Sequence, residues 1–147
     1  MKKSYALLWS LALILTLVAT GCKKKVKPLS ERIAKAWIAE TIKEGSTLVY
    51  TRGGSSNTVP GYSSFRLTLT PTTVTYTERD GTTFTGTWEL QGDSKLILKG
   101  LNPQPTGSGG TVEFSIESID DMRLVLKNLK ESPKTGNTIN EYTLSAS

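Results

Sequence analysis

Apolar and polar residues alternate with a period of two through most of the chain beyond its first quarter. The clearest case is the segment 82–90, where one side carries Phe84, Gly86, Trp88 and Leu90. A period of two places one face of a strand against a core and the other face in water. The other side of this segment is mainly threonine, which suits the wet face of a sheet. The pattern therefore predicts an all-β domain.

The alternating segments and the turn residues between them predict eight antiparallel strands. They are expected at about 36–51 (bent near Gly45), 64–70, 73–78, 82–90, 94–99, 111–118, 122–128 and 139–144. If 36–51 is two strands, the count becomes nine. Short strands joined by turns favour an up-and-down barrel, which leaves no exposed sheet edge. Before the first strand, Ser30 is expected to cap a short helical turn over 31–35.

Three connections are long, at 52–63, 100–110 and 129–138. In a meander, successive connections fall at opposite ends of the sheet. The long ones take the first, fifth and seventh places, so we expect all three at one end. A rigid scaffold that gathers its long loops at one end typically presents a binding mouth there.

The first residues have the order of a secretory signal peptide. Lys2 and Lys3 precede an uncharged, mostly apolar run over 5–18, and small residues lead to Cys22. The run is shorter than the roughly 20 residues that a membrane span needs. We therefore expect 1–21 to be a cleaved leader and 22–30 a lysine-rich tether.

The stretch Ala19-Thr20-Gly21-Cys22 resembles the lipobox of bacterial lipoproteins. The resemblance implies that Cys22 carries acyl chains that hold the protein in a membrane of the bacterial cell envelope. The alternative is a free thiol, although a lone cysteine cannot form an internal disulfide. The lysines at 23–25 and 27 either attract anionic head groups or form a solvated tether. Surface-displayed lipoproteins of some lineages carry acidic residues here, so we expect this chain to face the periplasm.

The composition of the chain excludes several kinds of catalytic and metal-binding site. The chain has 147 residues, a net charge of +5, no histidine and one cysteine. Histidine-based general base catalysis, Ser-His-Asp triads and most zinc sites are therefore excluded. Much of the positive charge lies in the leader and tether, so the domain lacks the basic face of a nucleic-acid-binding protein. We expect no enzyme activity, no cofactor, no metal site and no nucleic-acid partner.

The domain at 31–147 resembles the lipocalin-like domains of small bacterial lipoproteins over about residues 31–144. The resemblance rests on Trp37, on Gly86-Thr87-Trp88 followed by a Gly92-Asp93 turn, and on Leu96-Ile97-Leu98. It implies an eight-stranded antiparallel barrel that holds a small apolar molecule, and it names no ligand.

Six aromatic residues are the candidate ligand contacts: Trp37, Tyr50, Tyr62, Phe84, Trp88 and Phe114. The alternative for Trp37 and Trp88 is a place in the core, with each indole N–H bonded to a carbonyl. The small Gly86 either leaves a pocket or allows its strand to coil tightly.

Two hypotheses for function follow from these observations. The first is an anchored barrel that binds a small apolar or amphipathic molecule through its mouth. The second is a non-catalytic envelope protein with a filled barrel, whose loop end binds a macromolecular partner of unknown identity.

Overall fold

The computed structural model describes residues 26–147, which form nine strands and three short helices. The predicted leader, the Cys22 acylation site and the lysines at 23–25 lie outside the described residues. Among the helices of residues 26–147, none is long and apolar enough to cross a membrane.

The described elements follow one another in a simple meander. They are α2 (Leu29–Ile33), β1 (Ala36–Glu44), β2 (Thr47–Thr51), η2 (Pro60–Ser64), β3 (Arg66–Leu69), β4 (Thr73–Thr77), β5 (Thr83–Gln91), β6 (Lys95–Asn102), β7 (Val112–Ile119), β8 (Arg123–Asn128), η3 (Pro133–Thr135) and β9 (Asn140–Ala146).

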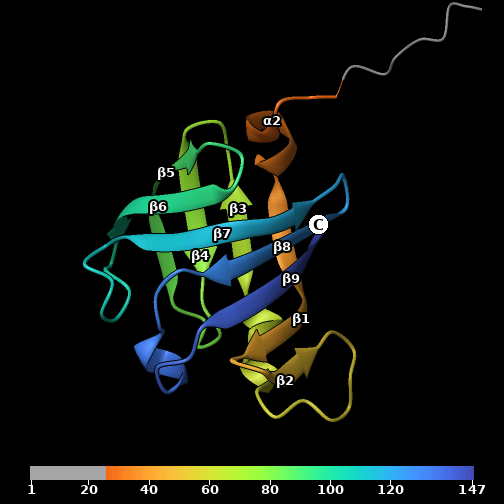
Figure 1. Cartoon of the computed structure of the whole chain (residues 1–147). Helices are drawn as coiled ribbons and strands as arrows, with labels where there is room; N and C mark the ends of the chain where they lie inside the picture. The colour runs from red at the N-terminus through yellow and green to blue at the C-terminus, as the bar shows by residue number, and fades with distance from the viewer. Residues whose placement is uncertain (1–25) are drawn as a thin grey trace, which may run out of the picture.

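The sheet closes on itself. From β3 to β9 each strand pairs antiparallel with the next, and β1 pairs with both β3 and β9. Trp37, for example, lies opposite Leu67 of β3 and Ala146 of β9. These strands form the predicted up-and-down barrel, and β2 is an additional strand on the second half of β1 (Figure 1). This is the lipocalin-like architecture that the sequence predicts.

The first predicted strand is in fact two strands. β1 and β2 form a hairpin in which Glu44 lies opposite Thr47. Gly45, between them, has φ +62°, which glycine adopts without steric cost and which reverses the chain within two residues. The two-strand alternative for 36–51 is therefore confirmed, and the single bent strand was wrong.

The predicted cap at Ser30 was also wrong. The helix α2 begins at Leu29, so Ser30 lies inside it, and no side chain caps the helix. The backbone N–H groups of Glu31 and Arg32 both donate to the carbonyl oxygen of Pro28. Proline, with its fixed φ, is well suited to the start of a helix.

A bulge near Gly86 tightens the barrel. On β6, Gly100 and Leu101 together oppose the single residue Gly86 of β5. A Cβ built on Gly86 would lie 2.4 Å from the carbonyl oxygen of Lys99. Gly86 therefore lets the backbones of β5 and β6 approach closely. Of the two alternatives for this glycine, the structure agrees with tight coiling of the strand and not with a pocket for a ligand.

The barrel interior is filled over most of its length. Five aromatic rings lie in contact: Phe65, Tyr76, Phe84, Phe114 and Tyr142. We call these five residues the aromatic cluster. Phe65 and Tyr142 are stacked with ring centroids 5.0 Å apart. Leucines from β3, β6, β8 and β9 surround the cluster and are almost fully buried.

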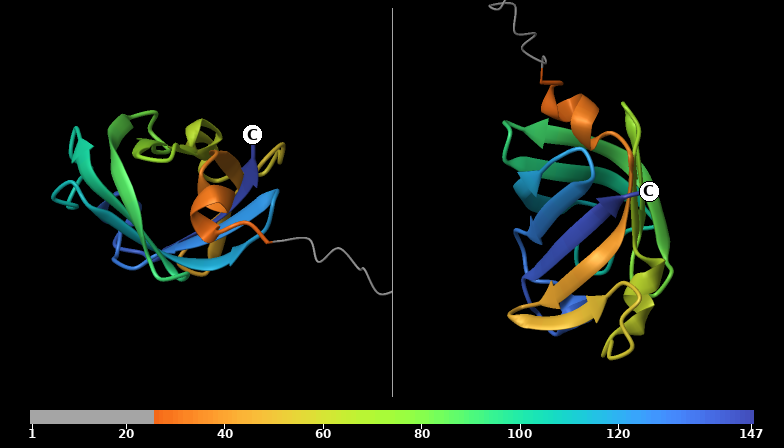
Figure 2. Two further views of the ribbon diagram at one scale, coloured as in Figure 1. Left: turned by 90° about the horizontal axis from the view of Figure 1, so that it is seen from above. Right: turned by 90° about the vertical axis from the view of Figure 1, so that its right-hand side faces the viewer.

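The two ends of the barrel differ. At one end, the helix end, α2 lies beside the short turns 70–72, 92–94 and 120–122 (Figure 2). The other, the loop end, carries 78–82, 103–111 and 129–139, and segment 52–65 reaches it through η2. The prediction that the long connections share one end is confirmed.

Candidate functional site

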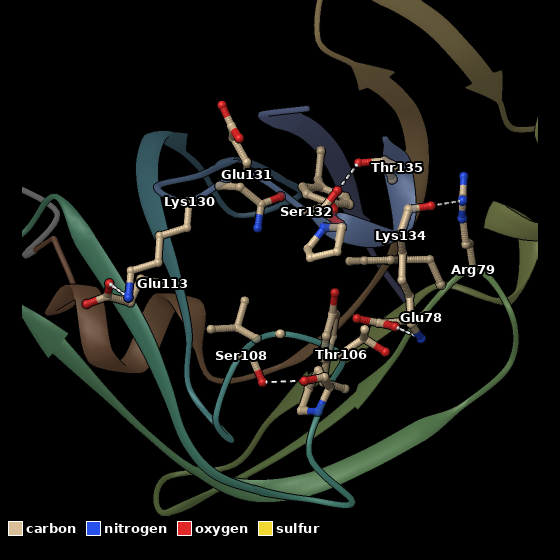
Figure 3. A pocket seen from close by; sticks show the side chains of 18 of the residues that line it. Glu78, Arg79, Thr106, Ser108, Glu113, Lys130, Glu131, Ser132, Lys134 and Thr135 are labelled. Carbon is tan, nitrogen blue, oxygen red and sulfur yellow. Dashed lines mark hydrogen bonds and ion pairs between the residues drawn. The ribbon is translucent and has the colours of Figure 1, made fainter. Parts of the chain in front are cut away.

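A cavity of about 100 Å³ opens at the loop end, between the aromatic cluster and the long loops (Figure 3). Its floor is formed by Tyr62, Phe65, Tyr76 and Tyr142. Ser132, Lys134 and Thr135 lie across it from Thr106 and Ser108, which belong to a different loop. The cavity thus combines an aromatic base with a polar rim.

The loops reach the rim because local contacts fix their shape. A Cβ on Gly107 would lie 2.9 Å from Cγ of Pro133, so the segments 103–111 and 129–139 touch here. Within the second segment, Thr135 and Thr138 share a 2.8 Å hydrogen bond between their hydroxyls. The 129–139 segment is therefore folded over part of the mouth.

One ion pair joins the rim to the floor. The Tyr62 hydroxyl donates to Oε1 of Glu44 at 2.8 Å, and Arg79 pairs with the same oxygen at 2.6 Å. Burial is the main cause that raises the pKa of Tyr62, with smaller contributions from Tyr142 and from the bond to Glu44. Tyr62 therefore stays protonated and acts as a donor.

A second ion cluster ties loop 129–139 to the turn after β4. The Lys134 ammonium pairs with Glu78 and, at 2.7 Å, with Asp80. Arg79 also donates to the backbone carbonyl of Lys134. The hydrogen bond from Lys134, followed by those from Thr82, lowers the pKa of Asp80 to about 2. Both carboxylates are thus engaged by a cation that the protein itself supplies.

Two asparagines face the barrel interior at the loop end and differ in their partners. Asn140 of β9 is fully buried and bonds to Thr135, Thr138 and the Tyr142 hydroxyl. Asn128 ends β8 and lines the cavity. Its Oδ1 is covered by protein, yet no hydrogen-bond donor within residues 26–147 reaches it.

The structure places the six predicted contact residues in three groups. Tyr62 lines the cavity, and Tyr50 packs against it with ring centroids 6.2 Å apart. Phe84 and Phe114 belong to the aromatic cluster below the floor. Trp37 and Trp88 lie toward the helix end and are not among the lining residues.

The two indoles behave as the core interpretation expects. Trp37 donates to the carbonyl oxygen of Ile33 at 2.9 Å, and Trp88 donates to that of Thr70 at 2.7 Å. Trp37 is fully buried, whereas Trp88 is partly exposed.

Sequence reasoning missed most of the polar residues of the site. Asn128 continues the inward row of Leu124 and Leu126, so the period of two is the signal that could have placed it inside. Glu78, Arg79 and Lys134 carry no such pattern, because turns and long loops bring them together. The acidic residues of the turns do not gather: among residues 26–147, no group of three or more potential ligand residues is arranged to hold a metal ion.

Comparisons with known proteins add two distant structural likenesses. No family model and no curated protein matches the chain. A lipocalin-like protein from Bacteroides uniformis is 16% identical, with a TM-score of 0.48 over 79% of this chain and 99% of that one. An uncharacterized protein from Bacteroides eggerthii is 11% identical, with a TM-score of 0.49 over 78% of this chain and 98% of that one.

Proposed function

We propose that this protein is a membrane-anchored, non-catalytic binding protein that takes up part of a small amphipathic molecule at the loop end of its barrel. The observation that carries the proposal is the cavity of about 100 Å³ between an aromatic floor and a polar rim. Concave sites with apolar linings and a few polar groups are the usual form of small-molecule sites.

The lining favours an amphipathic ligand over a wholly apolar one. The rings of Phe65, Tyr76 and Tyr142 offer apolar surface, and its burial contributes about 25 cal/mol per Å². Above them the rim presents charged and hydroxyl groups, including Glu78, Arg79 and Ser132. A ligand with one apolar and one polar part matches both.

The size of the cavity limits how much of the ligand enters. Sites for drug-sized molecules are about 300–1,000 Å³, whereas this one is about 100 Å³. We therefore expect a small group to enter the barrel while the rest of the ligand lies along the rim.

A tryptophan at the rim should block binding. Thr106 is exposed and lines the cavity, so Thr106→Trp is expected to fill the mouth without disturbing the core. We expect small aromatic fragments to bind the wild type and to lose about tenfold or more in affinity for this variant. Isothermal titration calorimetry or ligand-observed NMR measures the change.

Thr72→Trp is the matched control, because Thr72 is equally exposed but lies in a turn at the helix end. It should bind fragments as the wild type does. Equal binding by the wild type and Thr106→Trp would place the ligand elsewhere and contradict the proposal.

The filled interior favours a second candidate function. Trp37, Phe114 and Leu124 are fully buried, and the aromatic cluster leaves no large central space. The same fold would serve a protein whose barrel is filled and whose loop end binds a macromolecular partner. Failure of every small fragment to bind would leave this candidate as the better supported one.

Anchoring is a separate part of the proposal, supported by the lipobox-like sequence at Cys22. We expect Cys22→Ala to move the protein from the membrane fraction to the soluble fraction and to remove the acyl mass from its N-terminal peptide. Fractionation followed by mass spectrometry measures both. A wild-type N-terminal peptide without added acyl mass would contradict this part and leave the binding proposal intact.

A further inference from the structure

The floor of the cavity contains a tyrosine hydroxyl that the fold leaves unused. Tyr76 lies on the inward side of β4, is 4% exposed and lines the cavity. Its hydroxyl makes no hydrogen bond within residues 26–147. It is also not one of the unpartnered side-chain atoms there that are sealed from solvent, which belong to Glu40, Asn128 and Ser145. The Tyr76 hydroxyl is therefore open to the cavity, and an unpartnered polar group inside a protein requires an explanation.

A second unused hydrogen-bond donor belongs to the same floor. Tyr142 of β9 also lines the cavity, and its oxygen accepts a hydrogen bond from Nδ2 of Asn140 at 3.3 Å. An amide nitrogen only donates, so this bond does not use the hydroxyl hydrogen of Tyr142. No acceptor in the described part of the chain takes that hydrogen. The rings of Tyr76 and Tyr142 both pack against Phe65 and Phe114, so one aromatic cluster holds the two hydroxyls.

Both hydroxyls keep their hydrogens at neutral pH. Burial is the largest cause that raises the pKa of Tyr76 and of Tyr142 above that of an exposed tyrosine. Tyr62, the third tyrosine of the floor, differs because its hydroxyl already donates to Glu44. The floor therefore offers two O–H donors that the protein does not use, on Tyr76 and Tyr142.

The charges around the floor disfavour a negatively charged ligand group. Arg79 and Lys134 are the cations that lie over aromatic rings at the loop end, and each is paired with carboxylates of the protein. Glu131 also lines the cavity, is exposed and forms no ion pair within residues 26–147. A ligand carboxylate would lose its hydration, compete for cations that are already paired and be repelled by Glu131. An uncharged oxygen avoids these costs.

We infer that the ligand group buried in the cavity is an uncharged hydrogen-bond acceptor, the carbonyl oxygen of a ketone, ester or amide, which accepts from the hydroxyls of Tyr76 and Tyr142. The inference rests on the proposed function and narrows its ligand class. A carbonyl oxygen has two lone pairs and is able to accept both hydrogens. The rest of the ligand is then expected along the rim, where Glu131 offers a partner for a positive charge.

The test measures how the binding of four small probes depends on the Tyr76 hydroxyl. Cyclopentanone offers an acceptor, and methylenecyclopentane has nearly the same shape and offers none. Pyrrole offers a donor, and cyclopentanecarboxylate carries a negative charge. NMR titration gives the affinity of each probe for the full wild-type protein and for Tyr76→Phe, which removes only the hydroxyl. Comparing the two proteins probe by probe cancels the different hydrophobicities of the probes.

The expected result is a loss confined to the probes with an acceptor. Tyr76→Phe should weaken the binding of cyclopentanone about tenfold, the contribution of one hydrogen bond, and change that of methylenecyclopentane by less than about twofold. On the wild type, cyclopentanone should bind more tightly than cyclopentanecarboxylate. The melting temperature of Tyr76→Phe should be unchanged or higher, because the hydroxyl that it removes has no partner in the protein.

Two further variants serve as controls. Tyr50→Phe makes the same change at a buried tyrosine that does not line the cavity, and it should bind all four probes as the wild type does. Tyr62→Phe removes a hydroxyl that is bonded to Glu44, so it should lower the melting temperature. If Tyr76→Phe does not fold, Tyr142→Phe removes the second donor and, together with the ranking of the probes on the wild type, still decides.

Each contrary outcome has a distinct meaning. If Tyr76→Phe weakens cyclopentanone and methylenecyclopentane equally, or neither of them, the inference is overturned and the proposed function stands. A loss confined to pyrrole would mean that the Tyr76 oxygen accepts from the ligand, and tightest binding of the carboxylate would mean that the buried group is charged; both would overturn the inference. No binding of any probe at millimolar concentration would contradict the proposed function itself.

Discussion

Replacing Trp37 with alanine is expected to lower the free energy of unfolding by about 3–5 kcal/mol, the usual cost of emptying a site that held a buried tryptophan. Trp37 is fully buried, and its indole N–H donates to the carbonyl oxygen of Ile33. It therefore joins α2 to the helix end of the barrel. Urea unfolding followed by circular dichroism measures the loss.

The same variant separates a core role from a ligand role. Where Trp37→Ala remains folded, we expect its affinity for small fragments to match that of the wild type, because Trp37 does not line the cavity. Trp88→Ala is the comparison, and its partly exposed side chain should cost less stability. A stable Trp37→Ala protein with lost fragment binding would show that Trp37 contacts the ligand after all.

Replacing Gly86 with alanine is the second large effect expected. The added Cβ would lie 2.4 Å from the Lys99 carbonyl oxygen, and this neighbour is backbone, so strands β5 and β6 must separate. We expect a loss of about 3 kcal/mol in the free energy of unfolding. Equilibrium unfolding, with hydrogen exchange at β5 and β6, measures both the loss and its location.

Thr85→Ala provides the control for this experiment, since Thr85 is exposed one residue away on the outer face. It should change stability by no more than about 0.5 kcal/mol. A Gly86→Ala protein as stable as the wild type would mean that the two strands are not held this closely. The bulge would then not determine how closely β5 and β6 approach each other.

The barrel was predictable because its strands repeat one physical rule. Thr83 to Gln91 alternates outward threonines with inward apolar residues, and the structure keeps that register through β5. The side-chain period of two makes a shifted register costly, so alternation locates strands well. The shared end of the long loops 103–111 and 129–139 then followed from the order of the connections.

The hairpin at Gly45 was harder to predict, because glycine permits both a bend and a full reversal. Its φ of +62° belongs to the reversal, and pairing between β1 and β2 decides the choice. That pairing is a tertiary contact that local pattern does not encode. The start of α2 at Leu29 similarly depends on Pro28 and on packing of Ile33 into the barrel.

The site was only partly predictable. Tyr62 was named as a candidate because it is an aromatic residue beside a long loop, and it lines the cavity. Lys134 was missed because its partners Glu78 and Asp80 lie more than fifty residues away in the sequence. Asn128 was missed because an asparagine at a strand end resembles an ordinary turn residue until its missing partner is seen.

The most direct test of the binding site is residue-resolved NMR of the protein titrated with a library of small amphipathic fragments. We expect chemical-shift changes concentrated at the loop end, in residues 104–111 and 128–135 and near Glu78. Changes concentrated at the helix end, around 70–72 and 92–94, or no changes at millimolar fragment concentration, would contradict a binding site at the loop end.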